Sequence, residues 1–287
     1  AVPSRREESV PPLPEADCAA AAPALTVSLS AAGQLTEDLL AQRPARVYLP
    51  LEVLADLSSL PEAETEWCAV LPRVWRDRDE PALRRWLDHA QGLGVTGALL
   101  GNIGHLSLTR AAGLRLYGDF GLNVYNSYAL NYLRRKGLSS ACLSFELRFA
   151  QIRDLKKVLP AEAIVYGRLP LMITENCLVQ NRTGCRLSQA GPAVPLQAPC
   201  RGVHTLQDRI GAVFPLLPAY GHRTEIQNSR PLWLADRSDW KRLGLSFARL
   251  RFTTETPAEC AGILQAYRSG GAPPAQFTRG LYERGVE

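Results

Sequence analysis

Long apolar runs and methionine are both scarce in this chain of 287 residues. No apolar run approaches the roughly 18 residues needed to span a bilayer, so we expect no membrane partner. No charged start followed by an apolar stretch marks a secretion signal, which favours a cytoplasmic location. The only methionine is Met172, and the chain begins with Ala1. We therefore expect this sequence to be a piece of a longer protein.

Lysine is also scarce. Only four of the 33 basic residues are lysines, so arginine carries most of the formal net charge of +5. Arginine is well suited to phosphate recognition, although an arginine excess is also typical of GC-rich genomes. A mildly basic balance is compatible with nucleic-acid contact without requiring it.

Several catalytic signatures are missing from the sequence. It contains no HExxH helix, GxSxG elbow or P-loop, which argues against zincins, serine hydrolases and P-loop NTPases. Seven cysteines in a chain of this length do not form a dense disulfide scaffold. A papain-like Cys/His pair stays open, because its partners need not be close in sequence.

After an N-terminal linker, strand-like and helix-like segments alternate regularly. Residues 1–24 hold five prolines and no apolar period, which is typical of a linker. From residue 25 to 287, short aliphatic runs alternate with segments of helical period, several of which end at glycine. The predicted strands are 25–30, 46–50, 67–75, 95–101, 114–119, 140–144, 163–167 and 247–253.

Eight strands, most of them followed by a helix, predict an α/β fold of the (β/α)8 TIM-barrel type. An open, doubly wound sheet is the alternative. Residues 168–240 interrupt the alternation. They predict a large, irregular, cysteine-containing insertion after the seventh strand.

Reactive residues of such barrels follow the C-terminal ends of the strands. Asp119, Asn123, Glu146 and Arg168 occupy such positions, and we predict them as catalytic or substrate-binding residues. Carboxylates, amides and a guanidinium together suit a polar or anionic ligand. The alternative for each residue is that it caps the next helix. The wider set at strand ends includes Arg73, Trp75, Asn102, Asn126, Glu175 and Glu255.

The insertion also holds a cysteine cluster. Cys177, Cys185 and Cys200 fall within 24 residues, and thiolates suit zinc or an iron–sulfur cluster. The paired CxxC spacing of zinc fingers is absent, so loose thiols or a disulfide remain alternatives. A fourth ligand is needed for either metal. His204 and His222 are the candidates nearest in sequence.

Five segments together resemble peptidase family U32. They are YGDFGLNVYNSYALNYLRRKGLSSACLSFEL (117–147), IVYGRLPLMITENC (164–177), HTLQDRIGAVFPL (204–216), IQNSRPLWLAD (226–236) and FTRGLYERGVE (277–287). This family comprises collagenase-like peptidases, several of which are now understood as RNA- and ubiquinone-hydroxylation proteins. The chain is most similar to the C-terminal repeat of the long tandem form associated with hydroxylation of a ribosomal RNA cytidine.

The resemblance implies a barrel-like fold and, in the hydroxylating members, a [4Fe-4S] cluster held by four cysteines. Cys177, Cys185 and Cys200 match three of these positions, and His222 stands near the fourth. Such a set can hold a cluster or zinc, and a repeat without metal is the third alternative. The implied partners are an upstream U32 repeat and a middle domain of the same polypeptide, together with ribosomal RNA. A U32-type peptidase and a non-catalytic docking repeat are the alternative functions.

Overall fold

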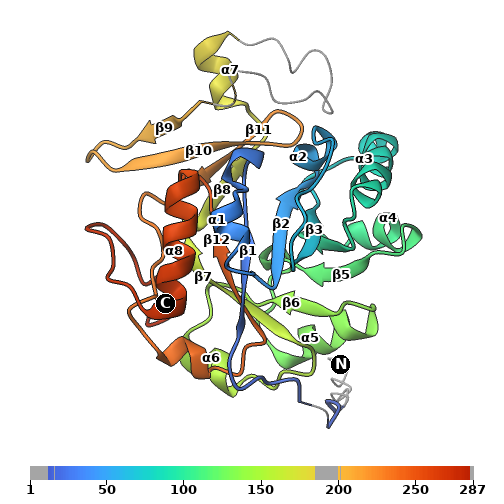
Figure 1. Cartoon of the computed structure of the whole chain (residues 1–287), viewed down its shortest axis with the longest axis vertical. Helices are drawn as coiled ribbons and strands as arrows, with labels where there is room; N and C mark the ends of the chain where they lie inside the picture. Colours follow the sequence, from blue (N-terminus) through green and yellow to red (C-terminus); the bar gives the residue numbers. More distant parts are fainter. Residues whose placement is uncertain (1–11, 16, 185–199, 201, 285–287) are drawn as a thin grey trace, which may run out of the picture.

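The computed structural model describes residues 12–15, 17–184, 200 and 202–284. Eight parallel strands close into a barrel in the order β1-β12-β7-β6-β5-β4-β3-β2 (Figure 1). The (β/α)8 prediction is therefore confirmed. The barrel strands are β1 (Ala24–Ser28), β2 (Arg46–Pro50), β3 (Glu66–Val70), β4 (Gly97–Leu100), β5 (Arg115–Gly118), β6 (Ser140–Cys142), β7 (Ala161–Gly167) and β12 (Phe247–Arg251).

Helices connect the strands on the outside of the barrel. They are α1 (Glu37–Leu40), α2 (Leu51–Ala55), α3 (Glu80–Gly92), α4 (His105–Ala111), α5 (Ser127–Arg135), α6 (Phe149–Asp154) and α8 (Pro257–Ser269). Short 3-10 helices add η1 (Ala32–Gln34), η2 (Asp77–Asp79), η3 (Phe120–Leu122) and η6 (Asp239–Arg242). None of the helices among the described residues is long and apolar enough to cross a membrane.

Local signals explain where these helices begin and end. Thr36, Asn126 and Thr256 each cap a helix with a side-chain oxygen that accepts a backbone hydrogen bond. Gly94 and Gly137 follow α3 and α5 at positive φ, a conformation that suits glycine. The main core lies between the barrel strands and these helices, and Leu49, Leu87 and Leu264 are almost fully buried in it.

The segment between β7 and β12 is more ordered than the sequence indicates. It forms a four-stranded antiparallel sheet in the order β8-β11-β10-β9, together with the short helix α7 (Leu178–Thr183). Its strands are β8 (Pro170–Thr174), β9 (His204–Gln207), β10 (Val213–Ala219) and β11 (Arg223–Gln227). Figure 1 shows this sheet at one end of the barrel, with α7 beyond it. The prediction of an irregular insertion is thus wrong for these strands.

The chain before β1 lies along the barrel. The backbone N–H of Ala20 donates to the carbonyl of Gly244 (3.3 Å), and that of Ala24 donates to Ser246 (3.0 Å). β1 begins at Ala24, next to the predicted end of the linker.

Candidate functional site

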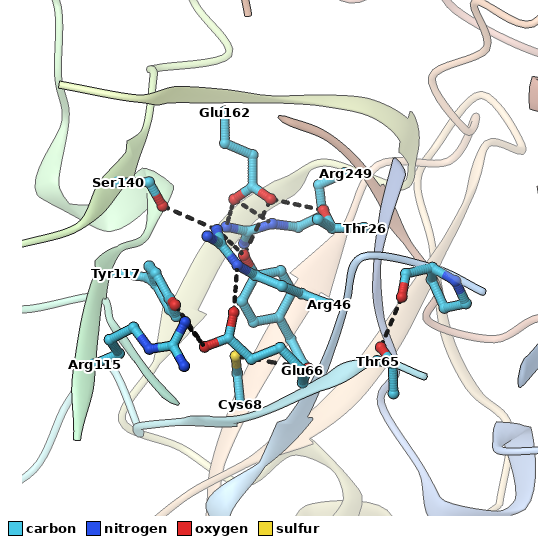
Figure 2. A network of polar contacts seen from close by, with 12 residues as sticks. Thr26, Arg46, Thr65, Glu66, Cys68, Arg115, Tyr117, Ser140, Glu162 and Arg249 are labelled. Atoms are coloured by element: carbon cyan, nitrogen blue, oxygen red, sulfur yellow. Dashed lines mark hydrogen bonds and ion pairs between the residues drawn. The ribbon is translucent and has the colours of Figure 1, made fainter. Parts of the chain in front are cut away.

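The interior of the barrel carries an ion-pair network, drawn in Figure 2. Glu162 on β7 and Arg249 on β12 are each only 1% exposed. The guanidinium of Arg249 donates to Glu162 Oε2 from Nε (3.0 Å) and also from Nη2. Thr26 (2.6 Å) and Tyr48 (3.2 Å) donate hydroxyl hydrogen bonds to Glu162 Oε1. The buried carboxylate is therefore fully engaged, as burial of a charge requires.

The same network continues to the other side of the barrel. Arg46 on β2 donates to Glu66 on β3 (3.0 Å) and to the Ser140 hydroxyl (3.0 Å). The Tyr117 hydroxyl donates to the second oxygen of Glu66 (2.6 Å). The Arg46 guanidinium lies 3.8 Å from the Tyr117 ring centroid and 3.9 Å from that of Phe247. These cation–π contacts help to hold the largely buried Arg46 charge in the barrel.

Asp119 links this network to a cavity at the mouth of the barrel. Its carboxylate accepts a hydrogen bond from Arg249 Nη1 (2.5 Å), and the side chain is almost buried. Both residues line a cavity of about 850 Å³. The opposite wall comes from β10 and β11 of the antiparallel sheet. The second sheet therefore covers the strand ends where TIM-barrel chemistry takes place.

Two arginines share one carboxylate in this cavity. Arg73, which follows β3, donates to Glu225 Oε1 on β11 (2.8 Å), and Arg251 on β12 donates to the same oxygen (3.3 Å). Both guanidinium carbons lie over the Phe120 ring, at 5.1 Å and 5.9 Å from its centroid. All four residues line the cavity. The barrel and the second sheet are thus joined by ion pairs at the mouth.

Aliphatic side chains make up much of the remaining cavity wall, including Leu29, Val70, Leu99, Ile173 and Leu216. Cavities of this kind, apolar with a few convergent polar groups, are the usual sites for small molecules and cofactors, and ~300–1,000 Å³ is their usual size. The arrangement can hold a planar or partly apolar group and orient its polar edge.

The structure places the four predicted catalytic residues in different surroundings. Asp119 lines the cavity, whereas Asn123, Glu146 and Arg168 are not among its lining residues. Asn123 ends η3 in a left-handed turn. Glu146 accepts a hydrogen bond from the exposed Tyr125 hydroxyl. A bridge between Val124 and Leu143 brings the loops of Asn123 and Glu146 side by side.

Arg168 has a connecting position at the end of β7. Its Nη1 donates to the carbonyl of Asn228 (3.1 Å) and to that of Ser229. Its own carbonyl accepts from Arg251 Nη1 (2.8 Å). Arg168 therefore holds the end of β11 against the barrel next to the mouth. Of the wider set predicted at strand ends, Arg73 and Glu255 line the cavity.

Three of the four predicted metal ligands, Cys177, Cys200 and His222, are among the described residues. Cys177 caps α7, since its Sγ accepts a hydrogen bond from the backbone N–H of Gln180 (3.3 Å). Cys200 is buried and lines the mouth cavity. His222 occupies a left-handed turn between β10 and β11, with φ of 58°. Cys185 lies outside the described residues.

The described residues do not fit a metal group by themselves. Among them, no three His, Cys, Asp or Glu side chains are grouped so that they could hold a metal ion. A site of Cys177, Cys185, Cys200 and His222 stays a prediction.

Sequence reasoning missed several residues of the site. Glu52, Glu225, Arg249 and Arg251 line the cavity, and Glu162 holds Arg249 through two hydrogen bonds. Glu52 comes just after the second strand, so the rule that reactive residues follow the strand ends, which selected Asp119, also applies to it. The signal for Glu162 and Arg249 is a charge inside an otherwise apolar strand, in AEAIVYG and FARLR.

A family model described as "Peptidase family U32" matches residues 49–218. The chain belongs to this family. The match runs from the last two residues of β2 into β10, and so includes five complete barrel strands and most of the second sheet. No curated protein matches this U32 chain.

Three solved structures are similar to this chain. The U32 peptidase Mk0906 is 12% identical over 88% of this chain and 100% of its own, with a TM-score of 0.48. The putative copper homeostasis protein CutC from Streptococcus agalactiae is 13% identical over 49% of this chain and 87% of its own, with a TM-score of 0.38. A mutant tryptophan synthase alpha-subunit from Pyrococcus furiosus is 12% identical over 51% of this chain and 78% of its own, with a TM-score of 0.36.

Proposed function

We propose that this U32 domain takes part in the hydroxylation of a ribosomal RNA cytidine, as a C-terminal repeat within a longer polypeptide. The observation that carries the proposal is the mouth cavity of about 850 Å³, in which Arg73, Arg251 and Phe120 lie beside the Glu225 and Asp119 carboxylates. RNA bases that are recognised out of a helix are stacked on aromatic rings or guanidinium planes and hydrogen-bonded along their edges. This cavity offers both kinds of surface.

The charge of the site supports the same proposal. Arg73 is a quarter exposed, so its guanidinium lies where the cavity meets solvent. There it can meet a phosphate while its partner Glu225 stays within the cavity. The ion pairs Asp119–Arg249 and Arg73–Glu225 hold these groups in place before a ligand arrives, which lowers the cost of binding.

We expect Arg73→Met in the full-length protein to reduce hydroxylation of the target cytidine about tenfold, because one recognition contact is worth roughly 1–3 kcal/mol. Mass spectrometry of ribosomal RNA from cells that carry the variant measures this. Arg84→Met is the matched control, since Arg84 lies on α3 in an exposed pair with Glu80. Equal hydroxylation in cells with and without the protein would refute the proposal.

The peptidase alternative has one observation of its own, because Cys200 and His204 line the same cavity. A thiol and an imidazole are the groups of a cysteine peptidase. Cleavage of a collagen-like peptide that Cys200→Ala abolishes, without any change in RNA hydroxylation, would replace our proposal with this one.

The cofactor is a separate proposal. Cys177, Cys185, Cys200 and His222 would hold a [4Fe-4S] cluster, which supplies redox chemistry, or a zinc ion. We expect protein purified without oxygen to contain iron and sulfide, and Cys177→Ala to reduce both. Elemental analysis that finds iron, sulfide and zinc all absent from fresh protein would contradict the site.

A further inference from the structure

Glu52 is a carboxyl in the mouth cavity to which the described part of the chain supplies no partner. It lies in the first turn of α2, directly after β2, and lines the cavity with its neighbours Pro50 and Val53. Among the residues the structure describes, its side chain has no ion pair and no hydrogen bond to another residue. By contrast, Asp119 and Glu225 in the same cavity are held by arginines. Glu52 is therefore available to a ligand.

The surroundings of Glu52 favour its neutral form. Burial raises the pKa of its carboxyl to about 7, against a small lowering by its own backbone N–H. A neutral carboxylic acid has one O–H donor beside one carbonyl acceptor, whereas the ionised form only accepts. Near neutral pH, Glu52 can thus present a donor–acceptor pair to the cavity.

Tyr220, which follows β10 of the second sheet, brings a buried hydroxyl to the same cavity. It stands after β10, lines the cavity, and is only 7% exposed. Its hydroxyl is buried and has no hydrogen-bond partner among the described residues. Burial, and then the charges of Asp79 and Glu52, raise the pKa of this hydroxyl, so it stays a donor. A buried hydroxyl without a partner calls for an external one.

The charged groups around this end of the cavity do not neutralise Glu52. They are Asp56 directly after α2, Arg78 and Asp79 before α3, Arg223 on β11, and His204 on β9. The Arg223 guanidinium is engaged by both oxygens of Glu175, at 2.9 Å and 3.0 Å. Arg78 lies 3.8 Å from Asp79. Neither cation is paired with Glu52.

We propose that Glu52 and Tyr220 bind the hydrogen-bonding edge of a cytosine base. The O–H of Glu52 donates to the ring nitrogen N3, its carbonyl oxygen accepts from the N4 amino group, and the Tyr220 hydroxyl donates to O2. Val53, Leu217 and Pro218 also line the cavity. The choice of cytosine rests on the proposed function, and the pairing scheme rests on the Glu52 carboxyl and the partnerless Tyr220 hydroxyl.

This pairing requires one shared proton. When Glu52 is ionised, it has no O–H to donate, and its oxygen lone pairs repel the lone pair of N3. The ionised form must therefore take up a proton before it can bind cytosine in this way. Because the pKa of Glu52 is raised, the neutral form persists up to about pH 7 and is lost as the pH rises further. Affinity for cytidine should therefore be constant below pH 7 and fall about tenfold per pH unit above it.

Calorimetric titration of the purified protein with cytidine, at several pH values between about 6 and 9, tests the inference. We expect the wild-type affinity to follow this profile. Glu52→Gln keeps one donor and one acceptor but cannot titrate, so it should bind within about threefold of wild type at pH 6 and lose the pH dependence. Glu52→Leu should bind at least about tenfold more weakly at pH 6. Glu37→Gln, on the exposed part of α1, should keep the wild-type profile.

Three results would overturn the inference: no cytidine binding by the wild type, a wild-type affinity that is flat with pH, or an unchanged pH slope in Glu52→Gln. Equal affinity for N4,N4-dimethylcytidine, which lacks the amino hydrogens, would also contradict the pairing. The cytidine-binding test and the RNA-hydroxylation test can fail independently of each other. RNA hydroxylation without pH-linked cytidine binding refutes the inference alone, whereas pH-linked binding without RNA hydroxylation refutes the proposed function alone.

Discussion

Arg249→Leu is expected to lower the free energy of unfolding by about 3–5 kcal/mol, because it strips two buried carboxylates of their common partner. Arg249 is 1% exposed and donates to Glu162 on β7 and to Asp119 after β5. Its guanidinium carbon also lies 4.5 Å from the Tyr48 ring centroid. Urea denaturation followed by circular dichroism measures the loss.

The control for this variant is an exposed ion pair. Arg43 and Glu64 lie 3.1 Å apart with side chains 71% and 75% exposed, so Arg43→Ala should change stability by only about 0–1 kcal/mol. The double variant Arg249→Leu with Glu162→Leu should lose less than the sum of the two single variants, since it leaves fewer charges unpaired. A loss below about 1 kcal/mol for Arg249→Leu would contradict a structural role for the network.

The barrel itself follows from local sequence signals. The predicted strand 46–50 coincides with β2, and the other seven lie within a few residues of their predicted positions. Aliphatic runs bounded by helix caps and glycines specify both the strands and their parallel arrangement. The predicted strand 163–167 starts directly after Glu162, so it misses the first two residues of β7.

The strands of the second sheet could not be predicted from the sequence pattern, for a physical reason. Its strands carry Pro170, Pro215 and Pro218, and proline is unfavourable in central strands. The faces of the sheet are also partly exposed to solvent, as the burial pattern of β9 shows. Its strands therefore lack the continuous apolar run that is typical of a barrel strand. Pairing between segments distant in sequence then decides the structure, as between β8 and β11.

The site was only partly accessible to sequence reasoning. The strand-end rule found Asp119, Arg73 and Glu255, which line the cavity, but it cannot rank one strand-end residue above another. Glu225 lies on β11 and reaches the cavity only because the second sheet closes over the barrel. That closure is a tertiary contact without a local signal.

Gly167→Ala is the other substitution with a large expected effect, about 3 kcal/mol or more. Gly167 ends β7 with φ of 123°, a conformation that costs roughly 1–3 kcal/mol for other residues. A Cβ there would also overlap the carbonyl oxygen of Arg251 and lie 3.0 Å from its carbonyl carbon. Backbone atoms cannot turn aside as a flexible side chain does, so β7 and β12 must separate. Thermal unfolding by differential scanning calorimetry measures the loss.

The consequences of this separation reach the mouth cavity. Gly167 exchanges backbone hydrogen bonds with Leu232 (2.8 Å and 3.3 Å), and Arg251 carries the guanidinium that contacts Glu225. Displacing either strand moves Arg251 away from the second sheet, so ligand binding should weaken together with stability. Gly92→Ala is the control, because Gly92 belongs to α3 and a Cβ there meets nothing within 4 Å. It should stabilise the protein by about 0.5–1 kcal/mol. If both glycine variants unfold at the wild-type temperature, the close approach of β7 to β12 does not constrain the fold.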